Sequence, residues 1–394
     1  MPGVVDPFAP AKLGPITIRN RMIKAATFEG RTPRRVVTDE LVAFHRAVAA
    51  GGVGMSTVAY CAVSPDGGTD GHQIVLGDEA LPGLRRLAEA IHTEGAAASA
   101  QIGHAGPVAN PAGTKRPALS PSRMLTPWMR MTHAATEEDI ARVTTDYANG
   151  ARVLVAAGFD AIEVHLGHNY LLSAFLSPKL NRRRDRWGGD VESRARFPRQ
   201  VVRAVREAAG GGVAVTVKLN MSDGVRGGLE PAESLAVATM LEQDGSIDAI
   251  ELTGGSSLSN PMYLFRGDAP VTEFAATLPP MIRVGFKLFG RRFLKTYPFE
   301  EAYFRDDARR FLRALKTPVI LLGGINRLDT IHSALDEGFS FVAMARALLR
   351  EPDLIRRMQA GTASEATCIH CNRCMPTIYR GTHCPLDAEP AAAR

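Results

Sequence analysis

Short apolar segments alternate with longer segments of helical periodicity along almost the whole chain. Eight of the short segments are rich in Val, Ile and Ala and have the length of buried strands. They are Arg21–Ala26, Val53–Val63, Ala96–Ile102, Phe159–Leu166, Val213–Leu219, Ile247–Thr253, Pro318–Gly323 and Phe339–Ala345. Strands that alternate with crossover helices form parallel sheets. The order predicts an α/β fold with about eight strand–helix units.

The intervening segments have helical features. In Thr136–Ala157 the apolar residues recur near one face, and three acidic residues follow Thr136 at the positive end of the helix dipole. Pro231–Gln243 begins with a proline, which suits the first turn. No linker rich in Pro, Gly or Ser divides the chain. We therefore expect a single (β/α)8 TIM barrel, with a doubly wound open sheet as the alternative.

The positions of polar residues favour the barrel. Polar side chains lie at or just beyond the ends of the first, third, fourth and fifth strands, and two glycines lie at the end of the seventh. These residues are Thr27, Gln101, His104, His165, His168, Tyr170, Lys218, Asn220, Gly323 and Gly324. In a TIM barrel the chemistry gathers at the carboxyl ends of all strands, whereas an open sheet concentrates it near one switch point.

Composition limits the classes of protein. The 394 residues are 45% hydrophobic and 22% charged, with a net charge of +6, which is typical of a globular protein and gives no indication of nucleic-acid binding. The N-terminus lacks the pattern of a secretion signal, and no apolar window has the length of a membrane span. Four of five cysteines crowd between Cys368 and Cys384. This distribution favours a reducing compartment, and we expect a cytoplasmic protein.

Three segments are longer than typical loops: Gly103–Thr132, Asn169–Asp190 and Ser256–Pro298. Long loops in a compact domain usually serve a site or a partner. The third contains FKLFGRRFLKTYPF, where basic and aromatic residues alternate. We favour a lid or a subunit contact of a homo-oligomer over a membrane surface or an acidic partner, because no clean amphipathic period runs through it.

Two imidazoles and a phenol follow the fourth predicted strand, at His165, His168 and Tyr170. A metal site of the H-x-x-H kind would need a third ligand nearby, and a single strand histidine is more often a core residue. Two neutral imidazoles at a barrel mouth can donate hydrogen bonds to a carbonyl oxygen that gains charge, and a phenol can transfer a proton. The combination indicates enolate chemistry.

Other residues indicate a phosphate-bearing cofactor with a planar heterocycle. Gly323, Gly324 and Arg346 occupy the usual phosphate position of the barrel fold, after the seventh and eighth strands. Gln101 carries an amide suited to the polar edge of a planar heterocycle. Lys218 would be costly to bury alone; it faces either an electron-rich ligand atom or an internal salt bridge to Glu163 or Glu251.

Several segments resemble the Old Yellow Enzyme family of FMN-dependent ene reductases, from about Asp6 to Met358. They are NRMIKAATFEG, QIGHAGP, IEVHLGHNYLLSAFLSPKLNRRRDRWGGDVESRARF, VKLN, ELTGG, VILLGGI and VAMARALLREPDL. The resemblance implies a barrel with FMN, which NADH or NADPH reduces and which then reduces the C=C bond of an α,β-unsaturated carbonyl compound.

The same resemblance implies roles for individual residues. Gln101 and Lys218 would meet the flavin pyrimidine edge, with Thr27 beside the flavin, and the backbone of Gly323, Gly324, Ala345 and Arg346 would hold the phosphate. His165 and His168 would bind the substrate carbonyl, and Tyr170 would protonate the α-carbon. A further set would brace this wall: Arg182, Asp185, Gly188, Gly189, Glu192 and Arg194. The chain differs from the family pattern at Phe28, Pro107 and Asn169.

The C-terminal segment carries Cys368, Cys371, Cys374 and Cys384, with two, two and nine residues between them. Clustered thiolates bind iron–sulfur clusters or zinc. The segment is similar to the 4Fe–4S site of dienoyl-CoA reductases and trimethylamine dehydrogenases, and a remnant without metal is the alternative. We expect the barrel to span residues 1–362 and a Cys-rich tail to span 363–394.

Three functional hypotheses follow. The first is an FMN-dependent NAD(P)H oxidoreductase that acts on a small enone. The second is a dienoyl-thioester reductase or amine dehydrogenase that uses the Cys site with an external electron partner. The third is a flavin-binding interaction protein without turnover. A phosphate-using lyase barrel is a further alternative, which a colourless protein would favour.

Overall fold

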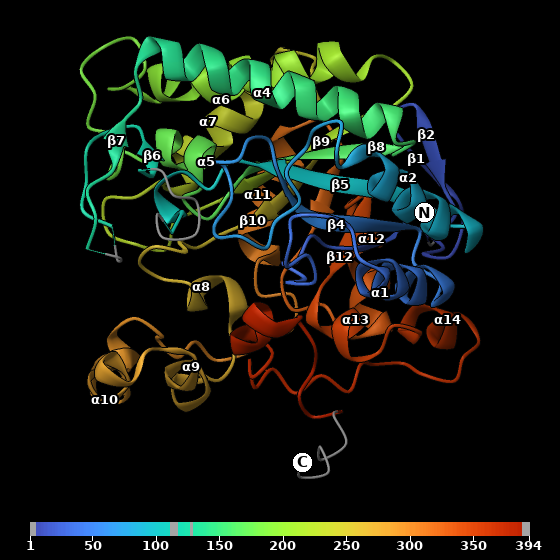
Figure 1. Ribbon diagram of the computed structural model, residues 1–394. Coiled ribbons are helices and arrows are strands. Elements are labelled where there is room, and N and C mark those ends of the chain that lie inside the picture. Colours follow the sequence, from blue (N-terminus) through green and yellow to red (C-terminus); the bar gives the residue numbers. More distant parts are fainter. Residues whose placement is uncertain (1–4, 111–116, 127–128, 388–394) are drawn as a thin grey trace.

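Eight parallel strands close into a barrel in the computed structural model, which describes residues 5–110, 117–126 and 129–387 (Figure 1). Their order around the barrel follows the order along the chain. They are β3 (Met22–Lys24), β4 (Met55–Ala62), β5 (Ala97–Gly103), β8 (Ala161–Leu166), β9 (Ala214–Asn220), β10 (Ala249–Thr253), β11 (Val319–Leu321) and β12 (Phe341–Met344). Each overlaps one predicted strand, so the TIM barrel is confirmed and the open sheet is excluded.

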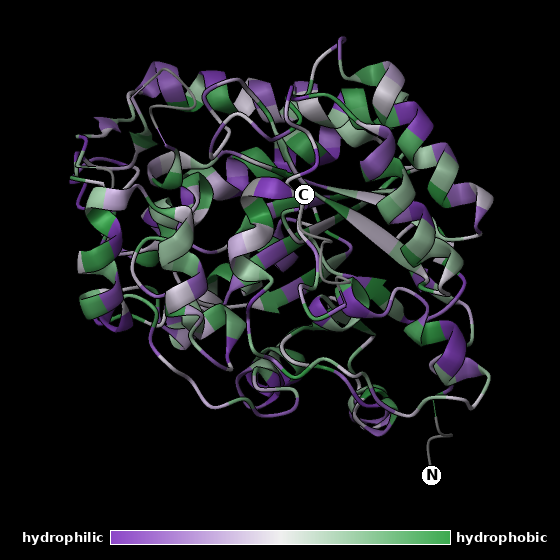
Figure 2. Cartoon of the chain, turned by 60° about the horizontal axis from the view of Figure 1, so that its bottom comes forward, coloured by the Kyte–Doolittle hydropathy of each residue, from purple (hydrophilic) through white to green (hydrophobic). Residues whose placement is uncertain are grey.

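Helices surround the barrel and return the chain to its amino end. The outer helices are α1 (Asp39–Ala50), α2 (Leu81–Thr93), α4 (Glu137–Ala156), α6 (Val191–Ala209), α7 (Pro231–Gln243), α11 (Arg305–Ala314), α12 (Leu328–Glu337), α13 (Arg346–Arg350) and α14 (Leu354–Gln359). Along their lengths they mix hydrophilic and hydrophobic residues, as amphipathic helices do (Figure 2). Helix α4 begins as predicted, because Thr136 and Asp139 form a capping box.

Two apolar clusters hold these layers together. The larger fills the space between the strands and the helices. The smaller lies inside the barrel, where Ala161, Ala214 and Ala249 meet Leu13 and Ile18 of an antiparallel hairpin, β1 (Ala11–Leu13) with β2 (Ile16–Ile18). The hairpin therefore closes the amino end of the barrel.

The loops at the other end are long, as predicted. The loop after β5 contains the 3₁₀ turn η1 (Gly106–Val108) and a small sheet of β6 (Leu119–Ser120) and β7 (His133–Ala134); its residues 111–116 and 127–128 lie outside the described part. Helix α5 (Leu171–Leu176) follows β8.

The segment after β10 forms a separate group of helices beside the barrel (Figure 1). These are α8 (Met262–Phe265), α9 (Val271–Thr277) and α10 (Pro280–Phe289), followed by the 3₁₀ turn η2 (Gly290–Arg292). No residue of α10 is buried, and Met281 is 96% exposed. The expected role of this segment as a lid or subunit contact remains a prediction.

After α14 the chain runs along the bottom of the barrel in Figure 1 and includes the 3₁₀ turn η3 (Met375–Arg380). Thr382 N–H donates to the Glu29 carbonyl oxygen at 2.7 Å, just beyond β3. The Cys-rich segment therefore packs on the carboxyl end of the barrel. The proposed division at residue 362 remains a prediction. Within the described ranges, no helix has both the length and the apolar character needed to cross a bilayer.

Candidate active site

A set of buried polar side chains lies inside the barrel above the alanine layer. Side chains alternate along a strand, so the strand that points Ala161 inward also points Glu163 and His165 inward. Gln101 Nε2 donates to Glu163 Oε1 at 2.7 Å. Lys218 Nζ lies 3.1 Å from Glu163 Oε1 and 2.6 Å from Glu251 Oε1. The internal salt bridge considered for Lys218 is therefore present, and it joins both carboxylates.

The charges in this set are balanced by each other rather than by water. Burial by itself lowers the pKa of Lys218, but attraction to Glu163 and Glu251 outweighs burial, so its pKa is raised. Burial raises the pKa of Glu251 to about 7, although Lys218 opposes this. Lys218 therefore stays charged beside two carboxyl groups, one of which takes up a proton near neutral pH.

His165, His168 and Tyr170 come together at the barrel mouth, as predicted. The ring centroids of His165 and His168 are 5.0 Å apart, and those of His165 and Tyr170 are 4.7 Å apart. His168 Nε2 lies 3.0 Å from the Thr253 hydroxyl oxygen. His165 Nδ1 is buried and has no hydrogen-bond partner among the described residues. A buried imidazole nitrogen without a partner fits a site that a ligand completes.

Both imidazoles are neutral at physiological pH. Burial, followed by His168 and Lys218, lowers the pKa of His165 well below its ordinary value. Burial, followed by Lys218, lowers the pKa of His168 to about 3. Each neutral imidazole can therefore donate an N–H hydrogen bond. Such donors stabilise negative charge that develops on an oxygen of the substrate.

The backbone at this turn accommodates Asn169, one of the positions at which the chain differs from the family pattern. His168 and Asn169 both have φ of 60°, in the left-handed region. Asparagine tolerates this region better than most residues that carry a Cβ. Asn169 N–H donates to Ser173 Oγ at 3.2 Å, and His168 N–H donates to Asn220 Oδ1 at 3.0 Å. These bonds hold the turn that presents His168.

The low pKa of His168 predicts acid sensitivity. Its folded pKa is about 3 and its ordinary value is 6.5, so between these values the unfolded chain binds more protons and stability rises with pH. From pH 7 to pH 5 this group should cost on the order of 2 kcal/mol. Urea unfolding at both pH values should show a smaller loss for His168→Asn than for the wild type. If His168→Asn loses as much free energy of unfolding between pH 7 and pH 5 as the wild type, the prediction is wrong. His332→Asn on α12 is the control.

Three neighbours of the site were not singled out from the sequence. The Tyr60 ring lies edge-on to Tyr170 with centroids 5.4 Å apart, and its hydroxyl donates to the Gly67 carbonyl at 2.8 Å. Lys24 pairs with Glu29 at 2.7 Å in the buried space beside α1. The signal for this pair was present, because Lys24 interrupts an apolar strand five residues before Glu29.

His104 has a different place from the other polar residues at strand ends. Its Nδ1 accepts a hydrogen bond from Gly106 N–H at 3.0 Å, and its Nε2 lies 3.9 Å from Asp66. This histidine therefore orders the loop after β5 and belongs to the core. Pro107 lies in the 3₁₀ turn of that loop.

The predicted phosphate position forms a backbone cradle between β11 and β12. Gly323 and Gly324 have φ of 114° and 71°, which only glycine adopts readily. Among the described residues, the N–H groups of Gly323, Gly324 and Ala345 donate no hydrogen bond. Arg346 follows at the start of α13, and it forms no ion pair with any residue that the structure describes. Free N–H groups beside an unneutralised guanidinium fit the phosphate of FMN. Thr27 lies half-buried just beyond β3.

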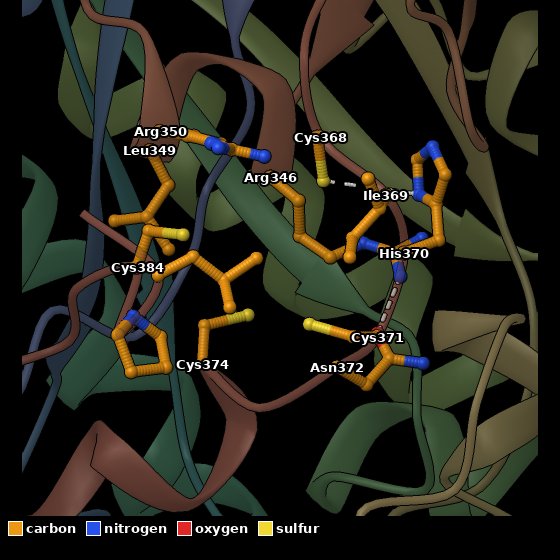
Figure 3. Close-up of a pocket in the computed structure, with 12 residues that line it drawn as sticks. Arg346, Leu349, Arg350, Cys368, Ile369, His370, Cys371, Asn372, Cys374 and Cys384 are labelled. Carbon is orange, nitrogen blue, oxygen red and sulfur yellow. Dashed lines mark hydrogen bonds between the residues drawn. The ribbon is translucent and has the colours of Figure 1, made fainter.

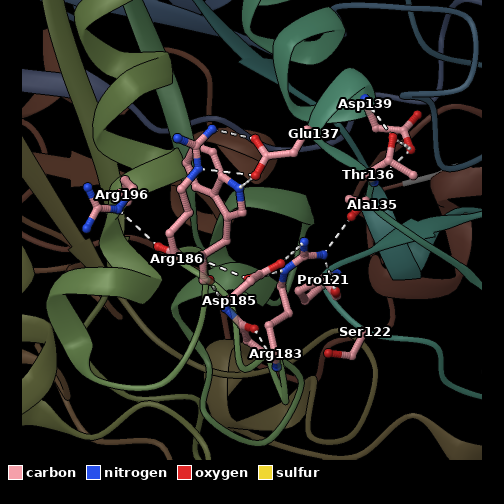
Figure 4. Close-up of polar contacts among 12 residues, drawn as sticks. Pro121, Ser122, Ala135, Thr136, Glu137, Asp139, Arg183, Asp185, Arg186 and Arg196 are labelled. Carbon is pink, nitrogen blue, oxygen red and sulfur yellow. Dashed lines mark hydrogen bonds and ion pairs between the residues drawn. The ribbon is translucent and has the colours of Figure 1, made fainter.

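The wall beside the site is braced by Arg183, a residue that the sequence did not single out (Figure 4). Its guanidinium donates to the carbonyl oxygens of Pro121 and Ala135 at 3.0 and 2.6 Å and pairs with Asp185. The side chain of Arg182, which we had expected to act here, donates to the Lys179 carbonyl oxygen at 3.2 Å. Arg194 is buried and braces the wall as predicted, through the Leu176 carbonyl at 2.8 Å.

The four C-terminal thiols line one hollow, and their sulfur atoms face a common space (Figure 3). In the described part of the chain, no three His, Cys, Asp or Glu side chains are arranged to hold a metal ion. Burial, with the other three thiols, raises the pKa of Cys374 to about 11. Four thiols around one space are the ligand type of zinc and of iron–sulfur clusters, and binding of either group would release protons.

This barrel, with its glycine cradle and its paired imidazoles and phenol at the carboxyl end, defines the class of flavin-dependent (β/α)8 oxidoreductases. Within that class, the chain belongs to the NADH:flavin oxidoreductase / NADH oxidase family, which matches residues 6–256. The resemblance to Old Yellow Enzyme is thereby confirmed. The chain is an FMN-dependent oxidoreductase that uses NADH or NADPH.

Relatives extend the match to almost the whole chain. The 4,4'-dithiodibutanoate disulfide reductase of Rhodococcus erythropolis is 58% identical over 96% of this chain and 94% of its own length. A metal reductase of Desulforamulus reducens is 33% identical over 97% of this chain, which spans only 53% of that relative. The Old Yellow Enzyme homologue of Zymomonas mobilis shares the fold, with a TM-score of 0.75 at 22% identity over 97% of this chain and 98% of its own.

Proposed function

We propose that the protein uses NADH or NADPH to reduce a small organic disulfide that carries carboxylate groups. The observation that carries this proposal is the relationship to the disulfide reductase of Rhodococcus erythropolis, which extends over 96% of this chain and 94% of the relative. The balanced reaction takes one disulfide, one NAD(P)H and one proton to two thiols and NAD(P)+.

The residues of the barrel mouth supply what such a reaction needs. FMN, when bound, accepts two electrons from NAD(P)H and passes them on as a hydride. Gln101 and Lys218 hold its pyrimidine edge, and the cradle after β11 and β12 holds its phosphate. The neutral imidazoles of His165 and His168 donate hydrogen bonds to the acceptor as negative charge develops on it. Tyr170 delivers the proton to the departing group.

Reduction of an α,β-unsaturated carbonyl compound is the second candidate. The geometry of His165, His168 and Tyr170 favours it, because a paired donor set and a phenol suit an enolate oxygen and its α-carbon. Here the hydride adds to the β-carbon and the phenol protonates the α-carbon. Family membership favours either reaction over a flavin-binding protein without turnover.

One spectroscopic experiment separates the candidates. The protein is purified without air, and its visible spectrum is recorded before and after NADPH. Cyclohexenone or 4,4'-dithiodibutanoate is then added to separate samples. Recovery of the flavin band with the disulfide alone supports the first candidate, and recovery with the enone alone supports the second. Absence of any flavin band after added FMN would exclude both.

The imidazoles of His165 and His168 are expected to contribute to the affinity for a ligand with a carbonyl or phenolate oxygen. His165→Ala should raise the dissociation constant of a phenol such as p-hydroxybenzaldehyde roughly tenfold, because one buried hydrogen-bond donor is lost. Titration of the flavin absorbance measures this constant. His332→Ala, the same change on the outer helix α12, is the control. A constant that does not change in His165→Ala would exclude His165 from the ligand site.

The hollow lined by Cys368, Cys371, Cys374 and Cys384 supports a second proposal, an iron–sulfur cluster. Four thiols line one space, and four cysteine thiolates are the usual ligands of such a cluster. Such a cluster would allow an external electron partner, as in the alternative of a dienoyl-thioester reductase or amine dehydrogenase. Iron and acid-labile sulfide in equal amounts would support the cluster, and zinc alone would exclude it.

A further inference from the structure

Two residues between the first three cysteines connect the hollow of the thiols with the loops after β11 and β12. The sequence CIHCNRC places His370 and Asn372 between them, and both residues have φ of 56°. Figure 3 shows both residues at the hollow that the four thiols line, and His370 Nδ1 lies 4.0 Å from Cys368 Sγ. Both side chains contact the two loops that form the phosphate cradle.

Asn372 holds the loop after β12. Its Oδ1 accepts a hydrogen bond from Arg346 Nη1, and its Nδ2 donates to the carbonyl oxygens of Asp268 at 2.9 Å and Arg266 at 3.3 Å. Asn372 is 1% exposed, so this amide is fixed. Arg346 is thus oriented by a neutral group and by the Arg266 carbonyl at 3.0 Å. Its positive charge is left for an anion, because no carboxylate neutralises it within the described ranges.

His370 holds the loop after β11. Its Nε2 accepts a hydrogen bond from Asn326 Nδ2 at 2.9 Å, two residues beyond Gly324. Its ring stacks on Phe299 with centroids 3.5 Å apart and planes 5° apart. The Phe299 ring in turn lies 2.7 Å from the position that a Cβ of Gly324 would take. His370 therefore contacts the glycine turn by two routes, one polar and one through the aromatic ring.

We infer that His370 and Asn372 are positioning residues of the FMN phosphate site, so the Cys-rich segment completes the cofactor site of the barrel. This inference rests on the proposed placement of the phosphate at Gly323, Gly324, Ala345 and Arg346. Two loops from different strands must meet one phosphate, and each is tied to the same short segment. Without the contacts of either residue, the loop that it holds becomes mobile. Part of the binding free energy of FMN is then spent on ordering the N–H groups and the guanidinium around the phosphate.

Riboflavin provides the test, because it differs from FMN only by the phosphate. Dissociation constants of both flavins for the flavin-free full-length protein are measured by quenching of flavin fluorescence. Asn372→Ala should raise the constant for FMN at least tenfold and that for riboflavin less than twofold. His370→Ala tests the other loop independently and should show the same selectivity. Asn372→Asp keeps an acceptor for Arg346 but adds a competing negative charge, and it should weaken FMN binding at least as much.

Arg373→Gln is the matched control, because Arg373 belongs to the same segment but pairs with Glu273 at 3.1 Å. It should change neither constant. Equal weakening of both flavins in Asn372→Ala and His370→Ala would show a general structural role, and unchanged constants would show none; either result overturns the inference. A wild-type protein that binds riboflavin as tightly as FMN would instead overturn the phosphate placement itself.

Discussion

Replacing Tyr170 with Phe should slow reoxidation of the reduced enzyme by an enone roughly 10²- to 10⁴-fold, the usual contribution of a positioned acid. Reduction of the flavin by NADPH should stay near the wild-type rate, because no proton from Tyr170 enters that step. The reason is the place of the phenol, beside His165 with ring centroids 4.7 Å apart. With a disulfide acceptor the loss should be smaller, because a thiolate with a pKa of about 8.5 departs more readily without a proton.

Stopped-flow absorbance measures the two half-reactions separately. Tyr60→Phe is the matched control, because Tyr60 faces Tyr170 but donates its hydroxyl to the Gly67 carbonyl at 2.8 Å. Burial, followed by Tyr170, raises the pKa of Tyr60 well above its ordinary value, so this phenol remains protonated and engaged. Equal slowing of both half-reactions in Tyr170→Phe would remove Tyr170 as the proton donor.

Replacing Lys218 with Met should lower the free energy of unfolding by about 3–5 kcal/mol, as expected when one partner of a buried ion pair is removed. The change leaves Glu163 and Glu251 as buried carboxylates without a cation, where Lys218 now lies 3.1 and 2.6 Å from them. Urea unfolding of the flavin-free protein measures the loss.

The sign of the pH dependence identifies the cause. Burial already raises the pKa of Glu251 to about 7, and loss of Lys218 should raise it further. A raised pKa favours the folded state while the carboxyl is protonated, so the defect of Lys218→Met should be smaller at pH 5 than at pH 8. Lys218→Arg keeps the charge and is the control. A defect below 1 kcal/mol, or one that grows toward low pH, would contradict the prediction.

Much of the barrel could be predicted from the chain, because its strands are buried on both faces. Apart from Asp160 at its start, Phe159–Leu166 is apolar except at residues that face the barrel interior. Period-2 alternation places Glu163 and His165 on that inner face. The convergence of His165, His168 and Tyr170 follows from their sequence order at one strand end. Local spacing was sufficient for both results.

Contacts between distant segments could not be predicted in this way. The sequence raised either Glu163 or Glu251 as the partner of Lys218, whereas barrel closure brings both to it. Arg182 and Arg183 are adjacent arginines, and only the fold of the loop after β5 decides that Arg183 meets Pro121 and Ala135. The acceptor substrate is likewise undetermined by spacing, because neutral donors and a phenol serve more than one acceptor.

The hairpin of β1 and β2 has a kinetic consequence. It seals one end of the barrel with Leu13 and Ile18 against the alanine layer, so nicotinamide and acceptor must enter through the opposite opening. If both molecules use this one opening, they cannot occupy the site at the same time. The oxidised nicotinamide must then dissociate before the acceptor binds. Initial-rate plots at several acceptor concentrations should therefore be parallel lines, and a large excess of either reactant should inhibit turnover.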